Sequence, residues 1–95
     1  MKYSSLTELS DWLAYKTHVM TLNAGFFVAL AREHPTLSIY ETKLCALILM
    51  ECETKECHTL LGMTTRAVQS MQWRLKDKFK LKEHETLHAY LVALR

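Results

Sequence analysis

Turn-forming residues are scarce in this chain, whose 95 residues include only two glycines and one proline. Gly and Pro supply many of the tight turns that join strands into hairpins, so a chain with so few of them is poorly suited to a sheet. Leu, Ala, Lys, Glu and Met are abundant, and all five are good helix formers. The sequence therefore predicts an all-α fold with one modest core and little room for a substrate cavity.

The first third of the chain carries apolar residues at helical spacing, with a break at residues 23–25. Asn23 is a good N-cap residue, so we expect one helix at about 5–21 and a second at about 24–33. One long helix bent at Gly25 is the alternative. Pro35 disfavours helical backbone at His34, so the segment should end there.

A second set of signals follows Pro35. Ser38 and Glu41 have the spacing of a capping box, and the helix that they begin, to about Met50, is apolar nearly all round. A helix without a polar face must be central in the fold. Thr54 is expected to cap a short helix that ends at Leu61.

Gly62 then provides a tight turn, and Thr64 is expected to cap a basic helix at about 65–80. A short helix, a three-residue turn and a longer helix form a helix-turn-helix. The last helix is predicted at about 83–94, with one apolar side formed by Leu87, Tyr90, Leu91 and Leu94.

Positive charge is concentrated in one segment. Residues 64–82 contain six Lys or Arg and one acid, Asp77, although the whole chain has a net charge of only +2. On a helical wheel, one side of this helix is expected to be buried, and it carries Val68, Gln72, Leu75 and Phe79, with Met71 at its edge. A one-sided helix with a basic polar face is typical of a helix that binds the major groove of duplex DNA.

The polar face divides into two predicted roles. Gln69 can pair with adenine through two hydrogen bonds, and Arg66 suits guanine or phosphate. The base-facing residues are predicted to be Arg66, Gln69, Ser70 and Trp73. Phosphate contacts are expected from the start of the helix and from its basic flanks, namely Thr64, Thr65, Arg74, Lys76, Lys78, Lys80 and Lys82.

The stretch from Leu37 to Leu81 resembles the LuxR/GerE-type DNA-binding domain of bacterial transcription regulators. The pattern L-T-x-x-E is matched at Leu37, Ser38 and Glu41, and the pattern K-E-I-A-x-x-L-G-I-S-x-R-T-V is matched in part across residues 55–68. A variant in Bacteroidetes regulators, with F-F-x-x-L and then P-x-L-[ST] upstream, is similar over residues 24–94. Region 4 of sigma factors shares much of the same pattern.

This resemblance implies a four-helix domain, preceded here by one or two N-terminal helices, that binds double-stranded DNA as a dimer and regulates transcription. It places Gln69, Ser70 and Trp73 at base-facing positions. Three residues depart from the family pattern: His58 replaces a small residue, Cys57 replaces a branched aliphatic one, and Asp77 stands where Lys or Arg is common. They leave open a second interpretation, a helical protein-interaction module that keeps the fold with weak or no DNA binding.

The N-terminal segment, residues 1–34, is predicted to form a homodimer, while residues 35–95 form the DNA-binding domain. Aromatic residues are favoured at interfaces, and this segment is rich in them. We expect the dimer contact to use Leu6, Leu9, Trp12, Leu13 and Tyr15. The alternative is that these side chains cover the protein's own core. A regulatory protein partner is also compatible with the sequence.

Metal and enzyme sites are not expected. Cys52, Cys57 and His58 match no common zinc spacing, and His84 and His88 lack the Glu of an HExxH motif. Cys57 and His58 are adjacent, so on a helix they point about 100° apart and cannot act as a catalytic pair. The sequence therefore predicts no enzyme activity, no metal and no cofactor.

We expect the protein to be cytoplasmic. Three cysteines with no framework spacing suit a reducing compartment. No signal-type run follows Met1, and no apolar stretch approaches the roughly 20 residues that span a bilayer, so no membrane contact is predicted.

Overall fold

The computed structural model describes residues 3–94, and every regular element in that range is a helix. The helices are α1 (Leu9–Leu22), α2 (Phe26–Glu33), α3 (Ile39–Leu49), α4 (Thr54–Leu61), α5 (Thr65–Lys78) and α6 (Leu87–Leu94). The predicted all-α class is confirmed. Helices α1 and α2 are separate, as predicted, and do not form one long helix bent at Gly25.

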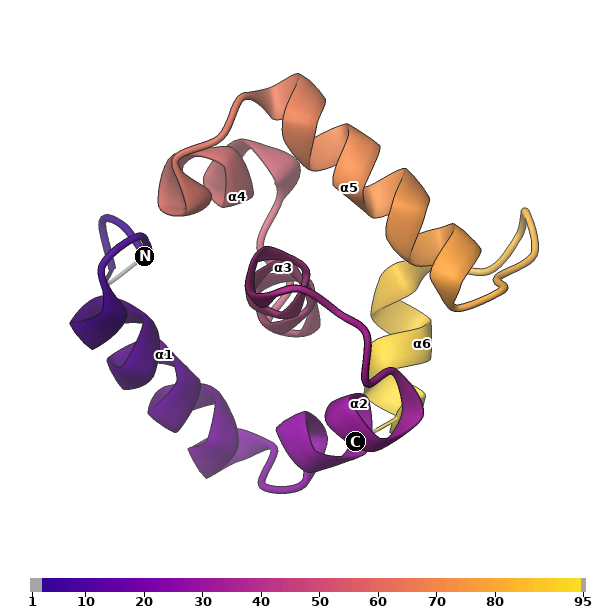
Figure 1. Ribbon diagram of the computed structural model, residues 1–95, viewed down its shortest axis with the longest axis horizontal. Helices are drawn as coiled ribbons and strands as arrows, with labels where there is room; N and C mark the ends of the chain where they lie inside the picture. Colours follow the sequence, from indigo (N-terminus) through magenta and orange to yellow (C-terminus); the bar gives the residue numbers. More distant parts are fainter. Residues whose placement is uncertain (1–2, 95) are drawn as a thin grey trace.

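Helix α3 lies at the centre of the molecule, and the other five helices surround it (Figure 1). Its sequence explains the position, because it has no polar side except at its first turn. Residues Leu44 to Leu49 are all buried, and four of them are completely inaccessible to solvent: Leu44, Cys45, Ala46 and Leu47.

The start of α3 has the predicted capping box. The Glu41 N–H donates to the Ser38 hydroxyl over 3.1 Å, and the Ser38 N–H donates to Glu41 Oε1 over 2.9 Å. These bonds satisfy two of the backbone donors that a helix start leaves unpaired. The cap fixes where the central helix begins.

Residues 3–8 form an N-terminal strap instead of the predicted first turn of helix. The Leu6 N–H donates to the Leu60 carbonyl over 2.7 Å, and Lys43 Nζ donates to the Leu6 carbonyl over 2.8 Å. These bonds hold the backbone at Leu6 against α4 and α3 as a strap. Helix α1 therefore starts at Leu9 and not at about residue 5.

The N-terminal segment shares one hydrophobic core with the rest of the chain. Trp12, Tyr15 and Phe26 are at most 3% exposed and belong to the same cluster as the buried residues of α3 to α6. Leu6, Trp12 and Tyr15 are therefore inside the protomer, where a second copy cannot reach them. The predicted dimer contact is wrong for these three residues, because covering the central helix takes their side chains.

Three predicted helix starts need correction. Gly25, not Asn23, is the N-cap of α2, and the Asn23 side chain is buried near Met50. Glu53, not Thr54, precedes α4, and its N–H donates to the Glu56 carboxylate over 3.2 Å. Helix α6 starts at Leu87 and not at about residue 83, because the Thr86 hydroxyl accepts from the Ala89 N–H.

Helices α3, α4 and α5 end in the same way. Just after each helix, one residue has left-handed backbone, with φ of 62° at Glu51, 66° at Gly62 and 55° at Lys80. The next N–H then bonds back to the carbonyl five residues earlier, as from Leu81 to Lys76 over 3.0 Å. This cap stops α5 at Lys78, two residues before its predicted end.

Candidate nucleic-acid interface

Helices α4 and α5 and the turn between them lie at the positions predicted for the helix-turn-helix. The Thr64 hydroxyl accepts from the Ala67 N–H over 3.0 Å, which confirms Thr64 as the cap of α5. Gly62 takes the left-handed backbone of the turn. A Cβ at Gly62 would lie 3.1 Å from Cγ2 of Thr7, so glycine also allows the N-terminal strap to lie against the turn.

The His58 side chain forms a hydrogen bond to the backbone of the turn between α4 and α5. Its Nδ1 lies 3.2 Å from the Met63 carbonyl oxygen, and because a carbonyl can only accept, Nδ1 carries the donated proton. The imidazole is half-buried. This departure from the family pattern thus adds a hydrogen bond across the turn instead of an unsatisfied group.

The inner side of α5 is the predicted buried stripe. Val68, Met71, Leu75 and Phe79 are all buried, with exposures of 0 to 6%. Gln72 is half-buried, and its Nε2 donates to the Thr54 hydroxyl on α4 over 3.3 Å. The stripe and this bond fix the rotation of α5 about its axis.

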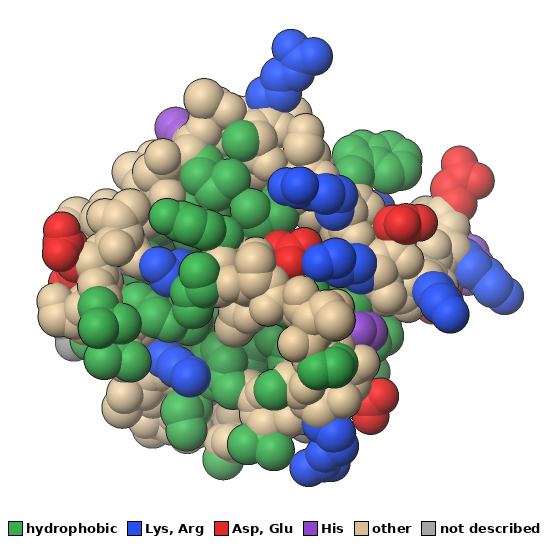
Figure 2. All heavy atoms as spheres, viewed as in Figure 1, with side chains coloured by type: hydrophobic (Ala, Val, Ile, Leu, Met, Phe, Trp, Pro, Cys, Tyr) green, Lys and Arg blue, Asp and Glu red, His purple; other side chains and the backbone are tan. Residues whose placement is uncertain are grey.

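The outer side of α5 carries the four predicted base-facing residues, and all of them are exposed: Arg66, Gln69, Ser70 and Trp73. Trp73 is the most exposed large apolar side chain described, at 75%. Figure 2 shows Lys and Arg side chains projecting over α5 and the segment after it, with a few acidic side chains among them. Among residues 3–94, none covers this side of the helix.

Three of the predicted phosphate contacts gather on one flank of Trp73. Lys76, Lys80 and Lys82 line a hollow of about 380 Å³ beside the Trp73 ring, together with Asp77 and Glu83. The last two carboxylates reduce the positive charge there. Lys76 also lines a second hollow of about 450 Å³, with Gln69, Gln72 and Trp73.

Arg74 lies on the other flank of α5. It lines a hollow between α5, the start of α3 and the turn at Gly62, with Tyr40 among its neighbours. Thr65 is the exposed first residue of the helix. Cationic or N–H-bearing groups therefore stand on both flanks and at the start of the exposed face.

Lys78, one of the predicted phosphate contacts, forms an ion pair within the protomer. Its Nζ lies 2.8 Å from Glu41 Oε1, and the Glu41 side chain is only 8% exposed. Burial alone raises the pKa of the Glu41 carboxyl, but hydrogen bonds from Lys78 and the Ser38 N–H outweigh it, so this pKa lies below its usual value. Lys78 therefore joins α5 to the cap of α3 and is not a free cation.

Sequence reasoning missed two contacts made by charged side chains. One is the ion pair of Lys78 with Glu41, and the other is the hydrogen bond from Lys43 to the N-terminal strap. Lys43 is 6% exposed, and its Nζ lies 5.8 Å from the Trp12 ring centroid and 5.3 Å from that of Tyr40. A lysine inside an otherwise apolar helix is the signal that could have indicated a buried polar contact.

The cysteines are poor nucleophiles. Cys45 and Cys57 are completely buried, and burial raises the pKa of each thiol to about 12. Cys57 Sγ is directed at the Cys52 carbonyl oxygen, 3.8 Å away, while His58 is directed at Met63. Within residues 3–94, no three His, Cys, Asp or Glu side chains are placed to hold a metal ion. No helix in that range is both long enough and apolar enough to cross a bilayer.

Comparison with family models, with curated proteins and with solved structures finds no match for this chain.

Proposed function

We propose that the protein binds double-stranded DNA through the exposed face of α5 and regulates transcription as a LuxR/GerE-type helix-turn-helix protein. One observation carries the proposal: Arg66, Gln69, Ser70 and Trp73 stand exposed on a helix whose opposite side is buried. A helix held in this way can enter the major groove without a change in the fold.

The chemistry of the flanks supports the same function. Lys76, Lys80 and Lys82 lie on one side of the exposed face and Arg74 on the other, so the helix can contact the phosphates of both strands. Thr65 adds the N-terminal N–H groups of α5, where a phosphate is favoured. In this proposal Gln69 reads an adenine, and the lysines contribute affinity without sequence preference.

We further propose that the protein acts as a homodimer in the cytoplasm. Leu9 and Leu13 remain available for the dimer contact, with exposures of 69% and 49% on α1. A second copy that covered this stripe would bring two recognition helices together on one DNA molecule.

The alternative function is a helical protein-interaction module with weak or no DNA binding. The exposure of Trp73 favours it as well, because a Trp is a frequent anchor of protein interfaces. Asp77 on the same face favours it too, since a carboxylate there is repelled by phosphate.

Binding of fluorescent duplexes, followed by anisotropy at several salt concentrations, separates the two functions. If the exposed face of α5 contacts several phosphates, affinity should fall by about tenfold or more between about 50 and 200 mM salt. Lys76→Ala should weaken binding to every duplex alike, whereas Gln69→Ala should cost about 1–3 kcal/mol at one base position only.

Arg32→Ala is the matched control for the loss of one positive charge, because Arg32 is exposed on α2, away from α5. It should leave DNA affinity and the salt slope unchanged. Lys78→Ala is not a clean test, since it also leaves the buried Glu41 carboxylate without its partner. Salt-independent binding, or equal losses with Lys76→Ala and Arg32→Ala, would favour the interaction module.

A further inference from the structure

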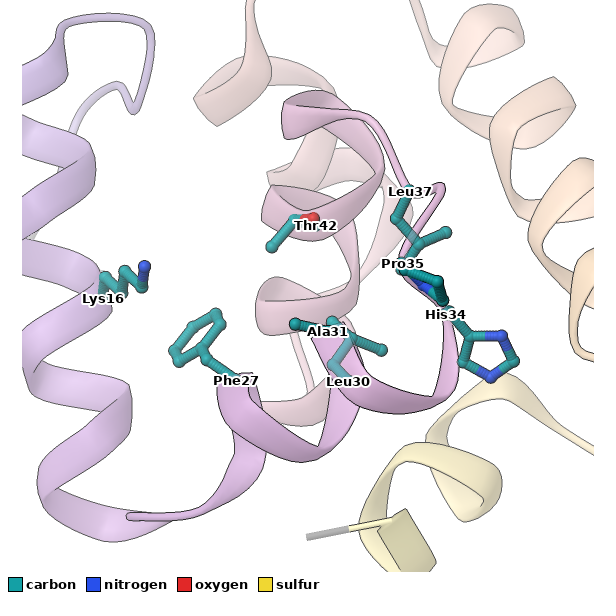
Figure 3. A pocket seen from close by; sticks show the side chains of 8 residues that line it. All are labelled: Lys16, Phe27, Leu30, Ala31, His34, Pro35, Leu37 and Thr42. Carbon is teal, nitrogen blue, oxygen red and sulfur yellow. The ribbon is translucent and has the colours of Figure 1, made fainter.

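A hollow on the other side of the molecule is unrelated to α5. It has a volume of about 350 Å³, and its lining comes from α1, α2, the start of α3 and the segment between α2 and α3. This volume is at the lower end of the range for small-molecule sites, about 300–1,000 Å³. Figure 3 shows the lining side chains: Lys16, Phe27, Leu30, Ala31, His34, Pro35, Leu37 and Thr42.

The lining is mainly apolar, with an aromatic ring at its centre. Phe27 and Leu37 are half-buried and Leu30 is 2% exposed, so these side chains are held in place by the core. His34 is turned away toward α6, where its Nε2 lies 2.6 Å from the Tyr90 hydroxyl (Figure 3). Such a surface favours an apolar ring or a short chain as the occupant.

Lys16 supplies the charge of this hollow. It extends from α1 toward α3, and its Nζ lies 5.2 Å from the centroid of the Phe27 ring (Figure 3). The only ion pair within residues 3–94 joins Lys78 to Glu41, so Lys16 has no carboxylate partner. A half-buried ammonium group beside an apolar surface is complementary to an anion that carries an apolar body.

Thr42 faces Lys16 across the hollow, from the first turns of α3 (Figure 3). Its hydroxyl donates to the Ser38 carbonyl oxygen over 3.0 Å, and the oxygen lies on the side turned away from Lys16 (Figure 3). Lys16, unlike Thr42, therefore has hydrogen-bond donors that can serve an acid group in the hollow.

We propose that this hollow binds a small carboxylic acid with an aromatic or branched apolar body. The ring lies against Phe27, Leu30 and Leu37, and the carboxylate accepts a hydrogen bond from Lys16 Nζ. The site does not include α5, so it can be tested without nucleic acid and stands or falls independently of DNA binding.

Titration with 3-phenylpropionate, followed by amide chemical shifts in heteronuclear NMR, tests the site. The neutral 3-phenyl-1-propanol is the matched probe, because it keeps the ring and the chain but lacks the charge. We expect saturable shifts centred on Phe27, Ala31 and Thr42, and an affinity about fivefold to tenfold higher for the acid than for the alcohol.

Two variants decide which group is responsible. Lys16→Met keeps an apolar stem over Phe27, and it should reduce the affinity for the acid to that for the alcohol. Lys55→Met, on α4 and outside the hollow, is the charge control and should change neither affinity. Ala31→Trp fills the hollow from an exposed position and should abolish saturable binding of both probes.

Several results would overturn the proposal. They are equal affinities of acid and alcohol, unchanged affinity for the acid in Lys16→Met, shifts centred on another part of the molecule, and the absence of saturable shifts. The first two contradict the assignment of Lys16 as the group that recognises the carboxylate, and the last two contradict the hollow as the binding site.

Discussion

Helices α3 and α5 both contribute to the same core, yet they use their sequences in opposite ways. From Leu44 to Leu49, α3 is buried on all sides, whereas α5 buries only one stripe and leaves Trp73 75% exposed. Burial of apolar area is the main source of stability in a domain of this size. The difference teaches that α3 holds the fold together, while the outer side of α5 is left available for a contact with another molecule.

The largest expected effect separates the two helices directly. Leu47→Ala removes a side chain that is 0% exposed in α3 and should lower the free energy of unfolding by about 2–5 kcal/mol. Trp73→Ala removes a larger side chain, but it should change that free energy by less than about 0.5 kcal/mol, because the ring buries little area. Urea denaturation followed by far-ultraviolet circular dichroism measures both changes.

A large loss in Trp73→Ala would contradict this contrast. The loss would then depend on protein concentration if a second copy covered the ring, and would be independent of it if the ring packed within the protomer. Leu13→Ala on α1 extends the comparison, because the proposed dimer contact predicts a concentration-dependent loss there and not at Trp73.

The sequence predicted the local features of these helices well. The capping box of Ser38 and Glu41, the Thr64 cap and the buried stripe of α5 all depend on residues three or four positions apart. The outward direction of Gln69 and Trp73 follows from the same periodicity. These parts needed no knowledge of the tertiary fold.

The features that sequence reasoning missed depend on distant contacts. The bonds of Lys43 to Leu6 and of Lys78 to Glu41 each join residues 37 positions apart. No local pattern distinguishes Lys78 from Lys76 or Lys80, so the same basic helix indicated phosphate contacts for all three. Likewise, Leu6 has the spacing of a helical residue, but its backbone bonds to Leu60 and Lys43 hold it in the N-terminal strap and not in α1.

The ion pair between Glu41 and Lys78 joins α3 to α5. The pKa of the Glu41 carboxyl lies below its usual value of 4.5 in the folded protein, so the carboxylate stabilises the fold above pH 4.5. This contribution should be lost as the pH falls below 4.5 and through the folded pKa. Glu41→Gln should make the unfolding free energy less dependent on pH in that range.

Lys78→Met tests the same bond from the side of α5. It leaves a nearly buried carboxylate without its cation, and because Lys78 itself is 38% exposed we expect a moderate loss, about 1–2 kcal/mol at pH 7. The loss should largely disappear in the Glu41→Gln background, as a double-mutant cycle from urea denaturation would measure. Additive losses would mean that Lys78 stabilises α5 in some other way.

The smallest expected effects come from a feature that α3 and α5 share, the left-handed residue after each helix. Glu51 and Lys80 occupy this backbone conformation with φ of 62° and 55°, which favours glycine. Glu51→Gly and Lys80→Gly should therefore each raise the free energy of unfolding, by about 0.5–1 kcal/mol, as urea denaturation measures. The two variants should differ in DNA binding, because Lys80 lines the hollow beside Trp73 and Glu51 does not. If Lys80→Gly is stabilised but binds duplex as well as Glu51→Gly does, Lys80 contacts no phosphate, and the cationic flank of α5 reduces to Lys76 and Lys82.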